Sequence, residues 1–378
     1  MARARGQLLV PALAIGLALI VGAVIMIVTS PMIAGSLDFR IPFQAYGALI
    51  KGSLGTPEQW VNGDFNAIIQ TLVETAPLVL AGLAVGLGFK GGLFNIGAQG
   101  QFLLAGLAAA VVGGLLAQSS PLLAVPAALI AALIVGAAWG FIPGALKAFT
   151  GAHEVVTTIM LNYIAIYIIA YLITGPLRDP TASFARTISV GNASLPVLLG
   201  RNGHLGIFIA ALAVPAVWWL LYRSTLGFEI RAVGANPDAA RYAGMRPRFL
   251  LILTMSLSGM LAGLAGGIQI LGLTGYMPMG YSTSIGFDAI AVALLGRAHP
   301  VGILLAALLF GAMRAGAGLM QVEAHIPVQM IDLLQGIILF FLAAEVVLRK
   351  WFHIRATGAG GVPAETTVTR SYGGQTSI

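Results

Sequence analysis

Apolar runs long enough to cross a lipid bilayer recur along the whole chain, and this feature narrows the possible folds more than any other. Inside hydrocarbon only helices and closed barrels satisfy every backbone hydrogen bond, and uninterrupted apolar runs of about 18 residues or more are typical of helices. Only 9% of the residues are charged, against about 25% in an average soluble domain. The sequence therefore predicts an all-α polytopic membrane protein.

We expect about ten transmembrane helices. The predicted segments are 8–28, 68–89, 93–116, 122–149, 155–173, 205–222, 249–273, 285–296, 301–320 and 326–348. The eighth is too short, because about twelve residues at 1.5 Å each cover only about 18 Å of a ~30 Å hydrocarbon core. The first run is longer than the apolar core of a signal peptide, so we expect it to be retained. An interfacial helix is expected near 43–50, and a polar external segment over 174–203.

The distribution of basic residues predicts the orientation. With residue 1 in the cytoplasm, 14 of the 20 Lys and Arg residues fall on the inner side. The six on the outer side are Arg40, Lys51, Arg178, Arg186, Arg201 and Arg314. Cytoplasmic loops carry an excess of Lys and Arg. We therefore expect a multi-pass protein of the cytoplasmic (inner) membrane with both termini in the cytoplasm, and we assign the net charge of +7 to topology rather than to nucleic-acid binding.

Residues 1–350 are expected to form a single membrane-spanning domain. The stretch 351–378 is rich in Gly, Thr and Ser, which predicts a disordered cytoplasmic tail. A polar stretch with five arginines, 223–248, lies between the two apolar halves of the domain. It cannot lie in hydrocarbon, where each charge costs several kcal/mol.

The stretch 223–248 carries signals for a short helix. Asn236 is a suitable N-cap, Pro237 suits the first helical position, Asp238 favours the positive end of a helix, and Gly244 suits the position after its last turn. A capped helix outside the membrane is a structure that a partner protein can hold. The alternative is an ordinary cytoplasmic loop whose only role is to set topology.

Two segments at matching positions of the halves are either glycine-rich or short. Residues 91–101 read GGLFNIGAQGQ, and residues 286–296 read GFDAIAVALLG. If spans two to five and seven to ten are repeats, their offset of five spans makes them inverted, and such paired segments indicate a substrate path near the midplane. Alternatively, the glycines pack helices closely and the amides bond between them. The candidate path residues are Phe94, Asn95, Gln99, Gln101, Thr158, Asn162, Phe287 and Asp288.

No catalytic or metal-binding constellation is evident. His153 and Glu154 precede the fifth span, where a capping role is favoured over a metal site or proton relay because the other histidines are scattered. The sequence has no phosphate-binding loop of the G-x-x-x-x-G-K-[ST] type, no G-x-S-x-G and no H-E-x-x-H motif. It has no cysteine either. We therefore expect a transport protein rather than an enzyme, with no catalytic residue, metal or cofactor on this chain.

Four blocks of sequence resemble the permeases of ABC importers of the nucleoside and simple-sugar class. They are FNIGAQGQFLLAG at 94–106, HEVVTTIMLNYIA at 153–165, GFEIRAVGANPDAARYAGM at 227–245 and GFDAIAVALLGRAHPVG at 286–302. The second block resembles the longer of two unlike permeases that occur together in nucleoside importers. The resemblance implies about ten helices in two inverted repeats, similar to the larger-bundle importers such as the cobalamin one.

The resemblance also implies a coupling helix near residues 234–244, seated in a groove of a cytoplasmic ATPase that binds ATP and Mg. The residues that it assigns to coupling are Gly234, Asn236, Pro237, Asp238, Ala239, Ala240, Tyr242 and Gly244. Further implied partners are a second permease, which would make a heterodimer, and an extracytoplasmic substrate-binding protein or lipoprotein. The expected solute is neutral and polar, with a nucleoside favoured over a simple sugar.

A rival function remains open at this point. In an ion-coupled secondary transporter of a small polar solute, Asp288, Glu154 or Glu74 would carry the coupling proton, since ionisable residues within membrane segments are often functional.

Overall fold

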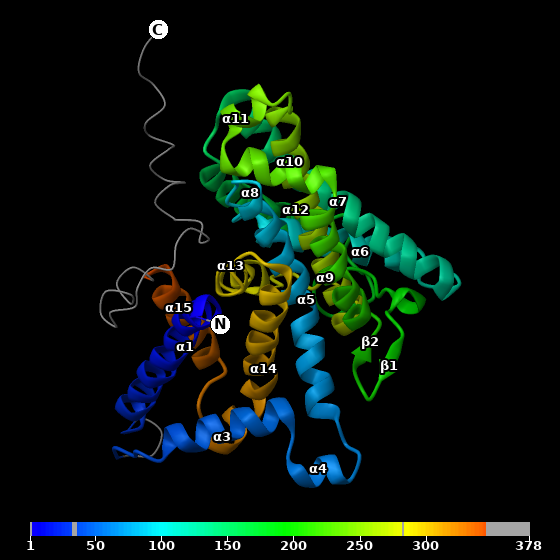
Figure 1. Cartoon of the computed structure of the whole chain (residues 1–378). Helices are drawn as coiled ribbons and strands as arrows, with labels where there is room; N and C mark the ends of the chain where they lie inside the picture. Colours follow the sequence, from blue (N-terminus) through cyan, green and yellow to red (C-terminus); the bar gives the residue numbers. More distant parts are fainter. Residues whose placement is uncertain (1, 32–35, 282, 345–378) are drawn as a thin grey trace. The chain divides into compact units, whose positions relative to one another are not determined.

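The structure, a computed structural model, describes residues 2–31, 36–281 and 283–344 (Figure 1). In this part of the chain eight helices are long and apolar enough to cross a membrane, and two more apolar helices, Ile285–Leu295 and Gln329–Ala343, are shorter. The prediction of an all-α polytopic membrane protein is confirmed. The inverted repeat remains a prediction, and the expected tail, 351–378, lies outside the described residues.

The described residues divide into two compact units, and the first contains residues 2–31, 36–75, 199–203 and 305–344. Its elements are α1 (Ala2–Thr29), α3 (Ile41–Leu54), α4 (Pro57–Val61), the start of α5 (Asn66–Lys90), the later part of α14 (Pro300–Ala324) and α15 (Gln329–Ala343). Within this unit α1 packs against α15 and α3. The Tyr46 hydroxyl, on α3, donates a hydrogen bond to the Leu19 carbonyl of α1 at 2.6 Å. The helix expected near 43–50 is therefore present as α3.

The second unit contains the described residues of 76–198 and 204–304. Besides most of α5 and the start of α14, it holds α6 (Ala98–Leu115), α7 (Pro121–Thr150), α8 (Glu154–Thr174), η1 (Gly191–Ala193), α9 (Gly206–Arg223), α10 (Thr225–Ala235), α11 (Pro237–Tyr242), α12 (Pro247–Gln269), the π-helical turn η2 (Ile270–Thr274) and α13 (Ile285–Leu295). Two short strands, β1 (Val197–Leu199) and β2 (Gly203–His204), pair in the segment between α8 and α9.

The core of the second unit is a close crossing of α7 and α12, which also packs against α6. Gly136 and Gly140 of α7 meet Gly259 and Gly263 of α12, and a methyl group added at any of the four would collide with backbone atoms of the other helix. In a membrane, helices gain no hydrophobic driving force from contact with each other, so close backbone approach and van der Waals packing hold them together. These glycines therefore fix the spacing of α7 and α12.

Three expectations about helix boundaries need correction. The third span does not begin at Leu93, because α5 ends at Lys90 and Gly92 adopts the left-handed conformation (φ +72°), which leaves residues 91–97 unwound ahead of α6. The last span begins at Gln329 rather than Ile326, since a residue that precedes a proline is disfavoured in a helix. The stretch after Arg223 holds an additional helix, α10.

Candidate functional site

Helix α11 is closed at both ends by the predicted residues. The Asn236 side-chain oxygen accepts hydrogen bonds from the backbone N–H groups of Asp238 (3.0 Å) and Ala239 (3.2 Å). At the other end, the N–H of Gly244 bonds to the Arg241 carbonyl, and Gly244 is left-handed at φ +82°. A glycine in this conformation after the last turn is a common helix stop. The expectation of a capped helix in this stretch is confirmed.

Helices α10 and α11 lie together at the N-terminal end of α12 (Figure 1). Ser224 starts α10 by accepting a hydrogen bond from the Gly227 N–H at 2.9 Å. The inner faces of the three helices form an apolar cluster of Ile230, Val233, Ala240 and Leu250. Sequence reasoning missed α10 because its helicity depends on this burial, and its composition alone, with two glycines and two charges, is not that of a typical helix.

The residues assigned to coupling fall into two groups. Pro237, Asp238, Ala239 and Tyr242 are exposed, and Tyr242 has 95% of its surface accessible. Ala240 is buried in the apolar cluster, so it anchors α11 instead of presenting a contact surface. The exposed surface of α11 therefore includes Asp238, Ala239 and Tyr242.

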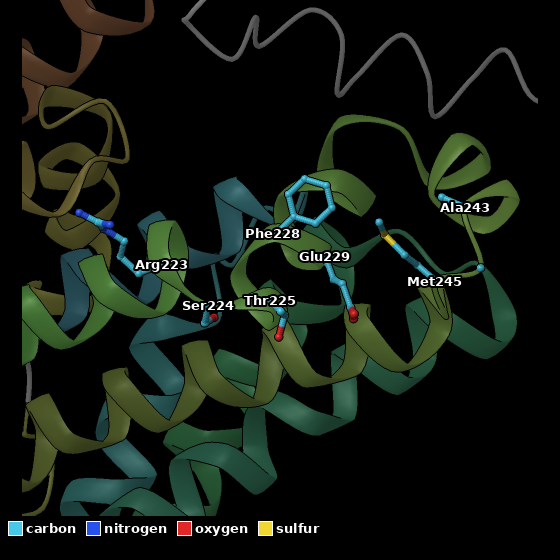
Figure 2. A pocket seen from close by; sticks show the side chains of 8 residues that line it. Arg223, Ser224, Thr225, Phe228, Glu229, Ala243 and Met245 are labelled. Carbon is cyan, nitrogen blue, oxygen red and sulfur yellow. The ribbon is translucent and has the colours of Figure 1, made fainter.

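A groove of about 460 Å³ lies beside α11 (Figure 2). Phe228 and Glu229 of α10 line one side of it, and Ala243 and Met245, which follow α11, line the other. Phe228 is exposed despite its apolar ring. The groove and the exposed face of α11 together offer a docking surface outside the membrane spans. Figure 2 also shows that the Arg223 side chain points away from the other residues of the groove.

The unwound segment before α6 is held by buried amides. The Asn95 Nδ2 group donates to Gln101 Oε1 and to Ser258 Oγ, at 2.8 Å each, and Gln101 Nε2 donates to Asn95 Oδ1 at 3.2 Å. The Ser258 hydroxyl, on α12, donates in turn to the Ala84 carbonyl of α5 at 2.6 Å. Ser258 was not among the predicted site residues. This network joins α5, α6 and α12.

Two other predicted polar residues, Asn162 and Gln99, make similar bonds between elements. Asn162 Nδ2 on α8 donates to the Ile96 carbonyl at 3.0 Å, and Gln99 Oε1 accepts from the Gly286 N–H of α13 at 2.9 Å. Thr158 is buried and donates a hydrogen bond within α8. The side chains of Asn162, Gln99 and Thr158 are buried. These bonds match the alternative in which the amides join helices, and their lining of a solute path stays a prediction.

Three path candidates have accessible side chains. Phe287 is 47% exposed, while Phe94 and Asp288 are half-buried. Asp288 accepts a hydrogen bond from the Ser284 hydroxyl at 2.9 Å. Of the predicted path residues, Phe287 is therefore the one whose side chain is most available to a solute.

The polar stretch and the unwound segment meet directly. The Gly234 backbone, in α10, lies against the backbone of residues 90–92. A side chain at Gly234 would collide with the backbone of residues 90–92, and a side chain at Gly92 would collide with the backbone of Gly234. Gly234 thus links the helix pair α10–α11 to the segment that carries the amide network.

Comparison with known proteins assigns the family. A family described as branched-chain amino acid transport system, permease component, matches residues 67–343. The guanosine ABC transporter permease protein NupP of Bacillus subtilis (strain 168) is 40% identical over 354 residues, which cover 92% of this chain and 97% of NupP. The chain belongs to this permease family. The permease is also 37% identical to the nucleoside ABC transporter permease protein NupB of Lactococcus lactis subsp. cremoris (strain MG1363), over 93% of this chain and 96% of NupB.

A sugar permease is a third relative. The permease is 33% identical to the glucose ABC transporter permease protein TsgB13 of Haloferax volcanii, over 82% of each chain. A second guanosine permease protein of Bacillus subtilis, NupQ, is 27% identical over 64% of this chain and 78% of its own. The predicted resemblance to nucleoside and sugar importer permeases is thus confirmed, and the permease is a multi-pass membrane transport subunit.

Proposed function

We propose that this permease is the membrane-spanning subunit of an ABC importer that carries a neutral polar solute into the cytoplasm, a nucleoside before a simple sugar. The observation that carries the proposal is that NupP and NupB, named for guanosine and for nucleosides, match more than nine-tenths of the chain at 40% and 37% identity. The glucose permease relative, at 33%, makes a simple sugar the second candidate.

The surface formed by α10 and α11 is proposed to dock on a cytoplasmic ATP-binding subunit. Three features support this role: the helix is closed at both ends, its outer face is exposed at Asp238, Ala239 and Tyr242, and a groove lies beside it. An isolated helix of this length is only marginally stable in water, so packing supplies its order. In this proposal the ATPase binds ATP and Mg, and the docked helix transmits its motion to the membrane helices.

The second permease is proposed to be an unlike chain. NupP and NupQ are both permease proteins named for guanosine in one organism, and this chain is 40% identical to the first but 27% to the second. If this chain corresponds to NupP, its partner corresponds to NupQ, and the two unlike permeases form a heterodimer. An extracytoplasmic binding protein is proposed to deliver the solute, and both termini are proposed to be cytoplasmic on the evidence of the basic residues.

The ion-coupled alternative is less well supported by the carboxylates. The Glu154 carboxylate, on α8, forms an ion pair with the Lys147 ammonium of α7 at 2.9 Å, and only 6% of the Glu154 side chain is exposed. This ion pair engages the Glu154 carboxylate in a contact between α7 and α8. Glu74 and Asp288 each accept a hydrogen bond, from Gln70 and Ser284.

The decisive experiment is transport into right-side-out membrane vesicles that contain the intact complex. Guanosine and glucose are offered separately, with ATP present or absent on the cytoplasmic side, while a proton gradient is maintained. We expect guanosine uptake that requires ATP and survives collapse of the gradient. Uptake driven by the gradient without ATP would overturn the ABC assignment. ATP-dependent uptake of glucose but not of guanosine would overturn the proposal that the solute is a nucleoside.

A further inference from the structure

A basic and aromatic cluster lies at the end of α9 and shares Arg223 with the lining of the groove beside α11. The Arg223 guanidinium lies 5.7 Å from the centre of the Trp218 ring, and the Arg231 guanidinium of α10 lies 5.2 Å from the Tyr222 ring. Both distances are within the range of favourable cation–π contacts. The rings themselves are continuous, since the centres of Trp218 and Tyr222 are 6.4 Å apart.

Two further basic side chains extend the same cluster. The His299 imidazole, which precedes α14, lies 5.5 Å from the Tyr222 ring. Burial and, secondly, the nearby positive charge of Lys90 lower the pKa of His299. Elements α5, α9, α10 and the turn before α14 thus converge on one patch within one compact unit, and its positive charges are those of Lys90, Arg223 and Arg231.

This concentration of positive charge is not neutralised within the described residues. The ion pairs of this part of the chain are Lys51–Glu323, Lys147–Glu154 and Arg186–Asp179. None of them involves Lys90, Arg223 or Arg231. Arg231 Nε donates to the Gly227 carbonyl at 3.3 Å, which holds the side chain in place without neutralising it. A fixed set of cations with no carboxylate partner is an arrangement that favours an anionic ligand.

The position of the cluster on α9 indicates which class of anion it binds. Helix α9 is one of the least buried candidate spans, with 28% of its most apolar window buried. Leu212 and Trp219 are exposed on its apolar surface. Trp and Tyr are enriched where a span meets the headgroup layer, and arginines at span ends extend their charge to that layer. Trp218, Tyr222 and Arg223 occupy this position on α9.

We propose that this cluster, formed by Lys90, Trp218, Tyr222, Arg223, Arg231 and His299, binds the headgroup of an anionic phospholipid. The guanidinium groups are suited to bidentate hydrogen bonds with a phosphate, and the rings beneath them fix their orientation. Because α10 carries both Arg231 and the contact with residues 90–92, a bound headgroup stabilises the helix pair α10–α11. The inference does not depend on which solute the permease carries.

The test uses the purified permease, together with the subunits that accompany it, in nanodiscs of phosphatidylcholine mixed with brominated phosphatidylglycerol or brominated phosphatidylcholine. Bromine quenches tryptophan fluorescence at short range. We expect stronger quenching by phosphatidylglycerol than by phosphatidylcholine at equal mole fraction, and we expect Trp218→Phe to remove the excess. Equal quenching by the two lipids would overturn the proposal.

Variants then distinguish a specific headgroup-binding site from the general attraction of basic residues to an anionic membrane surface. At about 1 kcal/mol for each basic residue near an anionic surface, Arg223→Gln with Arg231→Gln lowers the preference for phosphatidylglycerol about thirtyfold. The control is Arg248→Gln, an exposed arginine in the same polar stretch for which no ring contact is found. The proposal fails if the control lowers the preference as much as the double variant.

Two further arms distinguish other anions. Inorganic phosphate added to discs without phosphatidylglycerol should not protect the permease against thermal unfolding, whereas phosphatidylglycerol should. Protection by phosphate alone would mean a site for a free anion instead. Loss of the lipid preference when the ATP-binding subunit is present, and its return when that subunit is stripped away, would assign the cluster to protein docking and overturn the lipid proposal.

Discussion

The backbone of Gly234 in α10 lies directly against the backbone of Gly92, in the unwound segment ahead of α6. No side chain separates the two. The helix pair proposed to meet the ATPase therefore touches the segment whose amides join α5, α6 and α12, and displacement of one requires displacement of the other.

We predict that Gly234→Ala reduces transport at least tenfold. The added methyl group would collide with backbone atoms of Lys90 and Gly91, which cannot move aside as a flexible side chain can. Overpacking of this kind costs about 1–3 kcal/mol. Uptake and thermal stability are measured together, with Gly47→Ala as the control because a methyl group there meets nothing within 4 Å. Normal transport by Gly234→Ala would show that this contact is not needed.

Two neighbouring alanines of α11 should respond differently to the same change. Ala239 is exposed, so Ala239→Glu should leave the permease folded but abolish coupling, and solute should no longer stimulate ATP hydrolysis. Ala240 is buried beside Ile230 and Val233, so Ala240→Glu places a charge in an apolar cluster and should unfold the helix pair. Melting curves and ATPase assays of the assembled complex make the comparison. An Ala239→Glu complex that couples normally would exclude this face as the contact.

The orientation can be tested with single cysteines, since the natural chain has none. Ala235 is exposed at the end of α10, and Ala235→Cys should react with an impermeant thiol reagent only after the cells are opened. Val197, exposed on the segment between α8 and α9, provides the opposite control: Val197→Cys should react in intact cells. The reverse pattern would invert the topology.

Burial separates structural from solute-contacting residues among the path candidates. Asn95→Leu leaves the buried Gln101 amide without its side-chain partner, at about 1–3 kcal/mol, and removes one of the two hydrogen bonds of the Ser258 hydroxyl, so it should lower stability and transport together. Phe287→Ala removes an exposed ring and should change the apparent affinity for solute with little change in melting temperature. Measurement of both quantities for both variants tests the division. An unchanged affinity in Phe287→Ala would move the path elsewhere.

A buried histidine predicts a pH dependence of stability. His204 precedes α9, its Nδ1 accepts a hydrogen bond from the Gly206 N–H at 3.1 Å, and its ring packs against Gly272 of η2. Burial lowers the pKa of His204 below the usual 6.5. The folded state therefore resists a proton that the unfolded state accepts, so the stability from this group is complete above about pH 6.5 and is lost as the pH falls below it.

The measurement is the melting temperature between pH 7.5 and about pH 5. His204→Asn retains an acceptor for the Gly206 N–H but cannot be protonated. We expect the variant to lose less stability than the natural permease over this range. Equal losses would mean that other groups account for the acid sensitivity.

Local signals explain what the sequence could predict. Asn236, Pro237 and Gly244 act through hydrogen bonds and backbone angles within a few residues, so the bounds of α11 follow from the sequence alone. The apolar runs predicted the spans for the same reason. The break before α6 was visible in its glycines, although the first helical residue, Ala98, was not.

Contacts between distant residues explain what it could not. Asn95 meets Ser258, 163 positions later in the chain, and no pattern near Asn95 names that partner. Burial of Ile230 and Val233 against Leu250 makes α10 a helix, and this again depends on an element outside its own sequence. The buried position of Ala240, between exposed neighbours, has the same origin.

The glycine crossing of α7 and α12 has a mechanical consequence. The glycines of each helix recur at intervals of four residues, Gly136 and Gly140 on one and Gly259 and Gly263 on the other, and four residues correspond to a rise of about 6 Å. Because the two backbones are in direct contact, a sliding movement of one helix along the other is expected to occur in steps of about that length. A smaller displacement of the N-terminal end of α12 should therefore displace α7 by the same amount, because the two helices move as one rigid body.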